Sequence, residues 1–120
     1  MTKRAIRPFL KFWLPVYLYA GLIFIYSSLS SPPGLSYILY GDKLLHLAEY
    51  AILGFLVARA LKNSSAPQLR RHFRVYAILF SLVYGLSDEF HQHFVPGRQV
   101  EVLDLVADGL GAFFGQLALR

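Results

Sequence analysis

Ionisable side chains recur at helical spacing in three separate stretches of the sequence. The first stretch carries polar residues at steps of three and four, which predicts one shared helix face: Asp42, His46, Glu49 and Tyr50. Asp88 and Gln92 follow one turn apart, and Asp104 and Asp108 repeat that spacing near the C-terminus. Carboxylates and imidazoles placed in this way could act as general acids and bases, bind a ligand or coordinate a metal.

The segments that carry these residues are mostly apolar. Of the 120 residues, 56% are hydrophobic and 16% are charged, whereas a soluble domain usually has about 25% charged residues. No charged residue occurs from Phe12 to Gly41, and a spanning helix needs about 20 apolar residues. We predict an all-α membrane protein, a four-transmembrane-helix bundle in one domain over 1–120, with spans near these ranges: 11–29, 42–61, 74–90 and 99–119. A signal peptide is disfavoured for the first span, because its apolar stretch is too long.

Basic residues predict the orientation of the spans. All of the 12 lysines and arginines except Lys43 and Arg98 fall on one side of them. Basic residues accumulate on the cytoplasmic side of a membrane, so we expect both termini in the cytoplasm. The net charge of +5 then favours contact with anionic lipid head groups, and we expect no nucleic-acid partner. All seven acidic residues fall in or beyond the outer half of the membrane.

Asp108 is the most costly of these acids. It lies about 13 Å below the outer end of its span at 1.5 Å per residue, where a charge costs roughly 2.5–3.5 kcal/mol. Such acids either hold helices together through hydrogen bonds or form a functional site. The set occupies stripes on separate helices, which favours a functional site. On the last span, Asp104 and Asp108 share their stripe with Gly111 and Gly115, which predicts a close helix approach.

Taken together, these positions resemble the VanZ-like family of small bacterial membrane proteins over about 26–116. The matching positions are Ser27, Ser28, Asp42, Lys43, His46, Glu49, Tyr50, Leu53, Gly54, Gly85, Asp88, Glu89, Gln92, Phe94, Pro96, Gly97, Arg98, Asp104, Asp108, Gly111 and Gly115. This chain has Asp108 where the family often has asparagine. The resemblance implies a polytopic inner-membrane protein and a link to antibiotic resistance, through tolerance of teicoplanin-type glycopeptides.

We predict an outward-facing polar cavity formed by the last three spans and the connection between the third and fourth. The candidate catalytic residues are Glu49, Asp88, Glu89 and His46, and the candidate substrate-binding residues are Asp42, Tyr50, Gln92, Arg98, Asp104 and Asp108. Besides membrane lipids, the expected ligand is a lipid-linked or amphipathic molecule of the cell envelope, or a glycopeptide. A homo-oligomer is compatible with this, and the sequence leaves open whether the site is catalytic.

Two alternatives stay open. His46 has the spacing to share a zinc or manganese ion with Asp42 or Glu49, and oxygens could be added by Asp88, Glu89, Asp104 or Asp108. No compact metal motif occurs, so neither a metal nor another cofactor is predicted. There is no cysteine to act as a nucleophile, and serines such as Ser27 and Ser28 are better explained as helix-end hydrogen bonders. The second alternative is a different function for the whole protein: a structural or transport-related bundle, in which the buried acids only hold helices together or relay protons.

Overall fold

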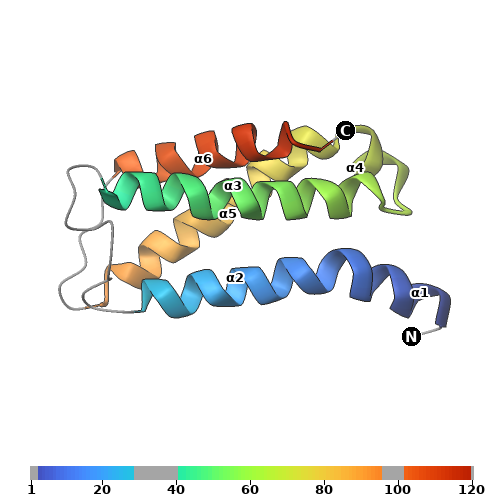
Figure 1. Ribbon diagram of the computed structural model, residues 1–120, viewed down its shortest axis with the longest axis horizontal. Helices are drawn as coiled ribbons and strands as arrows, with labels where there is room; N and C mark the ends of the chain where they lie inside the picture. Colours follow the sequence, from blue (N-terminus) through green and yellow to red (C-terminus); the bar gives the residue numbers. More distant parts are fainter. Residues whose placement is uncertain (1–2, 29–40, 96–101, 120) are drawn as a thin grey trace.

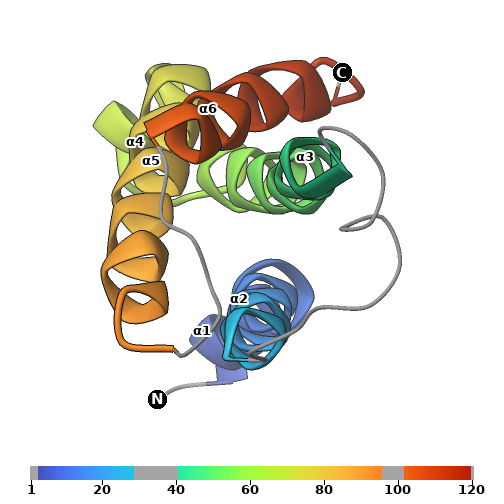
Figure 2. The ribbon, with the colours of Figure 1, turned by 90° about the vertical axis from the view of Figure 1, so that its left-hand side faces the viewer.

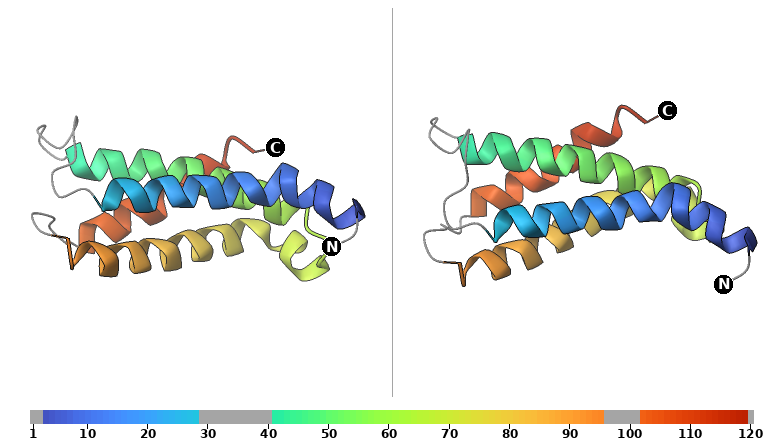
Figure 3. Two further views of the ribbon diagram at one scale, coloured as in Figure 1. Left: turned by 90° about the horizontal axis from the view of Figure 1, so that it is seen from below. Right: turned by 60° about the horizontal axis from the view of Figure 1, so that its bottom comes forward.

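Every regular element that the computed structural model describes is helical, which confirms the all-α class for those residues. The structure describes residues 3–28, 41–95 and 102–119, with side chains described for 6–28, 44–95 and 102–119. The elements are α1 (Lys3–Pro8), the π-helical η1 (Phe9–Trp13), α2 (Leu14–Ser27), α3 (Gly41–Lys62), α4 (Pro67–Arg71), α5 (Phe73–Gln92) and α6 (Val102–Gln116). Figures 1 and 3 show the long helices running along one another as a bundle.

The bundle has a tight part and a looser part. α3 packs most extensively on α6, and α5 packs against both. Seen from the end in Figure 2, α6 lies across α3, α5 runs down one side, and α2 lies below. The chain termini and α4 lie at one end of the bundle (Figure 1). The end of α2, the start of α3, the end of α5 and the start of α6 lie together at the other.

The helix bounds follow the predicted spans closely in the middle of the chain and differ at its ends. The predicted spans 42–61 and 74–90 correspond to α3 and α5. The first helical stretch includes Lys3, before the predicted start at 11, and α6 ends at Gln116, before the predicted end at 119. The predicted start of that last span, at 99, lies outside the described residues. Among the described helices, two are long and apolar enough to cross a membrane, over Ile6–Ser27 and Leu44–Lys62.

Pro15 explains the unusual geometry of the first helical stretch. Pro15 has no N–H for the carbonyl of Lys11, four residues earlier, so that carbonyl loses its usual partner. Arg59 of α3 donates to it instead, over 2.5 Å. The helix widens to π geometry just before Pro15, where the N–H of Leu14 bonds to the carbonyl of Phe9. The first helix therefore stays continuous across its prolines and is tied to α3.

Small residues allow α3 and α6 to touch through their backbones. A Cβ added at Gly111 would overlap the carbonyl of Leu47, and one added at Gly115 would overlap the carbonyl of Ala51. From the other side, Gly54 faces the backbone of Ala112. The predicted glycine stripe is therefore confirmed as a close helix contact, and it holds the acids of α6 against α3.

The exposure of α5 and α6 is inverted relative to a soluble protein. Their exposed faces carry large apolar side chains: Val75, Leu79, Phe80, Val83, Leu86 and Phe90 on α5, and Val102, Leu103, Val106, Leu110, Phe113 and Phe114 on α6. The buried faces carry small and polar residues instead, among them Ser81, Asp88, Glu89, Asp104 and Asp108. Soluble proteins rarely expose such extensive apolar surface unless it meets a partner or a membrane.

Candidate functional site

Polar side chains from three helices are buried together toward the end of the bundle where α6 begins. Seven of the predicted site residues are in this set, with exposed fractions from 0% for Tyr50 and Asp108 to 7% for His46. They are His46 and Tyr50 of α3, Asp88, Glu89 and Gln92 of α5, and Asp104 and Asp108 of α6. The helical spacing of each stretch placed these groups on inward faces, and the packing of α3, α5 and α6 brings the faces together.

His46 lies at the centre of the contacts between α3 and α6. Its Nδ1 is 2.7 Å from Oδ1 of Asp108, and because a carboxylate accepts, Nδ1 donates in this hydrogen bond. Its Nε2 lies 4.0 Å from Oδ2 of Asp104. The imidazole also stacks near the ring of Tyr50, with 6.3 Å between the centroids and 16° between the planes. One imidazole thus faces both aspartates of α6.

Glu89 completes a three-helix cluster with His46 and Asp108. Ligand-type atoms of these three side chains all lie within 4.8 Å of one another. Within the described part of the chain, neither carboxylate oxygen of Glu89 has a hydrogen-bond partner, and neither does Oδ2 of Asp108. A Cβ at Gly85 would lie only 2.6 Å from that oxygen, so the glycine makes room for Asp108 beside α5.

The end of α2 contacts the same region through two serines. Ser27 donates its hydroxyl to Oδ1 of Asp88 over 2.5 Å, and the Ser28 hydroxyl lies 2.9 Å from Nε2 of His91. Both hydroxyls are also within hydrogen-bond distance of the Phe24 carbonyl. The helix-end interpretation of the serines is therefore incomplete, because they also join α2 to α5. The contact of His91 was missed, although its position one turn after Asp88 places it on the same side of α5.

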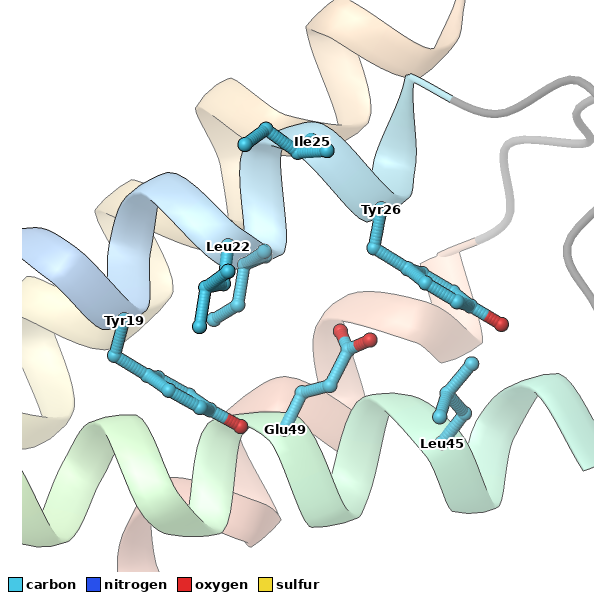
Figure 4. A pocket seen from close by; sticks show the side chains of 7 residues that line it. Tyr19, Leu22, Ile25, Tyr26, Leu45 and Glu49 are labelled. Carbon is cyan, nitrogen blue, oxygen red and sulfur yellow. The ribbon is translucent and has the colours of Figure 1, made fainter.

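Glu49 does not join the buried cluster. It lines a pocket of about 390 Å³ between α2 and α3, whose lining residues are Tyr19, Leu22, Ile23, Ile25, Tyr26, Leu45 and Glu49. Figure 4 shows its carboxylate pointing from α3 toward α2, between Tyr19 and Tyr26. The predicted common face of His46, Glu49 and Tyr50 is therefore wrong in part. Consecutive helical residues are about 100° apart, so Glu49 turns toward α2 when Tyr50 turns into the core.

Two predicted substrate-binding residues lie outside the described residues. These are Arg98 and the side chain of Asp42. The connection between the third and fourth predicted spans, over 96–101, also lies outside them. The described pocket involves α2, which the predicted cavity did not include.

The architecture defines a class: an α-helical protein with an apolar exterior and a buried acidic and histidine cluster. A family model for VanZ/LLP1 matches residues 4–120, so the chain belongs to the VanZ/LLP1 family. This confirms the resemblance carried by the motifs. No curated protein sequence and no solved structure matches the chain. Family membership and the two long apolar helices together indicate a membrane protein.

Proposed function

We propose that the chain crosses the bacterial inner membrane four times, with both termini in the cytoplasm. The apolar exposed faces of α5 and α6 support two further crossings beyond the two long helices. The described basic residues support the orientation, because they belong to α1, η1, the end of α3, α4 and the start of α5, and Figure 1 shows α1 and α4 at one end of the bundle. These residues are Arg7, Lys11, Arg59, Lys62, Arg70, Arg71 and Arg74. In this orientation the acidic cluster lies toward the outer side.

Single-cysteine labelling tests the topology cleanly, because the natural chain has no cysteine. Ser65, between α3 and α4, and His93, just after α5, are exposed at opposite ends of the bundle. We expect a membrane-impermeant maleimide to label the H93C variant in intact spheroplasts and the S65C variant only after permeabilisation. Labelling of both variants from outside would contradict the four-span topology.

We further propose that the protein binds a lipid-linked or amphipathic molecule of the cell envelope between α2 and α3, next to the acidic cluster. The observation that carries this is the pocket itself. Its walls are apolar and aromatic except for the carboxylate of Glu49, and Leu45 on its wall directly precedes His46 of the cluster. An acyl chain would fit the apolar walls, and Glu49 would accept hydrogen bonds from a polar head group. The family's link to glycopeptide tolerance makes a lipid-tailed glycopeptide such as teicoplanin the first ligand to test.

Binding and growth measurements with matched variants test this function. The Y19A and E49Q variants alter the pocket, whereas Y17A alters a tyrosine two residues away that is 59% exposed and lines no described part of this pocket. Glutamine keeps an acceptor oxygen but loses the charge, and a hydrogen bond to a charged group is worth about 1–1.5 kcal/mol more than a neutral one, so E49Q should bind fluorescent teicoplanin in nanodiscs about tenfold more weakly. We expect Y19A and E49Q to lower teicoplanin tolerance, and Y17A to retain both affinity and tolerance.

The alternative is a bundle in which the acids only hold helices together or relay protons. The hydrogen bonds from Ser27 to Asp88 and from His46 to Asp108 favour a structural contribution from those groups. Under this alternative, E49Q would bind and protect like the natural protein, while D88N would lower the amount of protein in the membrane. Undiminished binding in both pocket variants would refute the binding proposal.

A further inference from the structure

We propose that His46, Glu89 and Asp108 form a binding site for one divalent transition-metal ion of the zinc type. The site lies among α3, α5 and α6 and is separate from the pocket between α2 and α3. It therefore goes beyond the proposed lipid function and does not require it. It narrows the metal alternative raised from the sequence to one set of ligands, in which Glu89 and Asp108 from two other helices join His46.

The three side chains are arranged so that small movements would bring all three onto one ion. Their ligand-type atoms lie within 4.8 Å of one another, and Nδ1 of His46 is already 2.7 Å from Oδ1 of Asp108. Metal–ligand distances of about 2.0–2.2 Å place neighbouring tetrahedral ligands roughly 3.3 Å apart. Asp104 lies beside the cluster, with its Oδ2 4.0 Å from Nε2 of His46.

The carboxylate of Glu89 points independently to a ligand. Glu89 is only 4% exposed. In the described part of the chain, neither of its carboxylate oxygens has a hydrogen-bond partner. Oδ2 of the fully buried Asp108 is in the same situation. Buried polar groups are almost always paired, and buried charges are paired or coordinate metals. A cation between Glu89 and Asp108 would satisfy these oxygens at once.

The donor set selects the class of metal. One imidazole nitrogen with two carboxylate oxygens suits zinc or manganese, whereas calcium and magnesium favour oxygen ligands alone. Copper(I) and iron–sulfur sites are disfavoured because the chain has no cysteine thiolate. Three protein ligands leave a coordination position open, as in catalytic zinc sites. A bound ion would supply a Lewis acid for a phosphoryl or carbonyl oxygen of a ligand.

The test uses the full chain, purified in detergent and treated with a chelator, with Zn²⁺ alone as the probe. Calorimetry and metal analysis after dialysis should give one Zn²⁺ per chain. The E89Q and D108N variants should each bind Zn²⁺ at least about tenfold more weakly, because replacing even a residue that only orients a metal ligand costs about 10–100-fold in affinity. Co²⁺ added in place of Zn²⁺ should give visible absorption that depends on Glu89.

Two matched variants separate this site from other zinc-binding groups. E49Q removes a carboxylate on the same helix as His46, and H91A removes an imidazole on the same helix as Glu89. We expect both to keep one Zn²⁺ per chain, since neither residue is part of the cluster. The proposal is overturned if the natural protein retains no zinc after dialysis. This result is decisive by itself, so the test holds also if the variants do not accumulate in the membrane. It is equally overturned if E89Q binds like the natural protein, or if H91A loses as much affinity as E89Q.

Discussion

Replacing Gly115 with alanine is expected to destabilise the bundle by about 3 kcal/mol. The added Cβ would overlap the carbonyl oxygen, the carbonyl carbon and the Cα of Ala51. These are backbone atoms of α3, so they cannot rotate away as a side chain can. α6 would have to move off α3, and the packing that buries Asp104 and Asp108 would loosen. The measurement is thermal or denaturant unfolding in detergent, followed by circular dichroism.

The matched control is alanine at Gly21 of α2, where an added Cβ meets no atom within 4 Å. Both substitutions place alanine in a helix, where its intrinsic propensity is better than that of glycine. We therefore expect G21A to be neutral or slightly stabilising and G115A to be strongly destabilising. Equal stabilities of G21A and G115A would show that the contact between Gly115 and Ala51 is not as close as described.

Replacing His46 with leucine is expected to cost about 3–5 kcal/mol, the range for removing one partner of a buried charged pair. The substitution leaves Oδ1 of Asp108 without the hydrogen bond from Nδ1, in a side chain with no exposed surface. It also removes the ring that faces Asp104. Unfolding should be measured with a chelator present, so that metal binding does not contribute.

A double-mutant cycle with D108L isolates the pairwise contribution. We expect the double variant to lose less stability than the sum of the single variants, with a coupling of about 1–3 kcal/mol. Tyr50 is the natural control, because it stacks near His46 and, among the described residues, its buried hydroxyl has no hydrogen-bond partner. Y50F should therefore keep full stability. Additive losses in the cycle would mean that His46 and Asp108 do not interact as described.

Local sequence patterns predicted the helices well where the pattern was long and apolar. The stretch after Lys11 and the stretch before Lys62 each predicted a helix of membrane length, and both occur. The early start of the first helix was not predictable from Pro8 and Pro15, because proline usually limits a helix. The guanidinium of Arg59 compensates for the lost backbone bond, and that contact comes from a residue far along the chain.

The candidate site was partly predictable for the same reason. Spacing at three and four residues correctly indicated inward faces for His46, Asp88 and Asp108. It could not distinguish the direction of Glu49 from that of Tyr50, since both positions lie within one broad helical face. The packing of α2 against α3 decides this, and it gives Glu49 a pocket wall instead of a place in the cluster.

The sequence by itself determined that the chain is helical and apolar, that its acids and bases are separated along it, and that it carries the VanZ/LLP1 motifs. These properties depend on composition and local spacing, which need no knowledge of neighbouring segments. Only the tertiary structure decided that Glu89 meets His46 and Asp108, and that Ser27 reaches Asp88. Those contacts depend on the rotation and offset of one helix against another, which backbone contact at Gly111 and Gly115 sets.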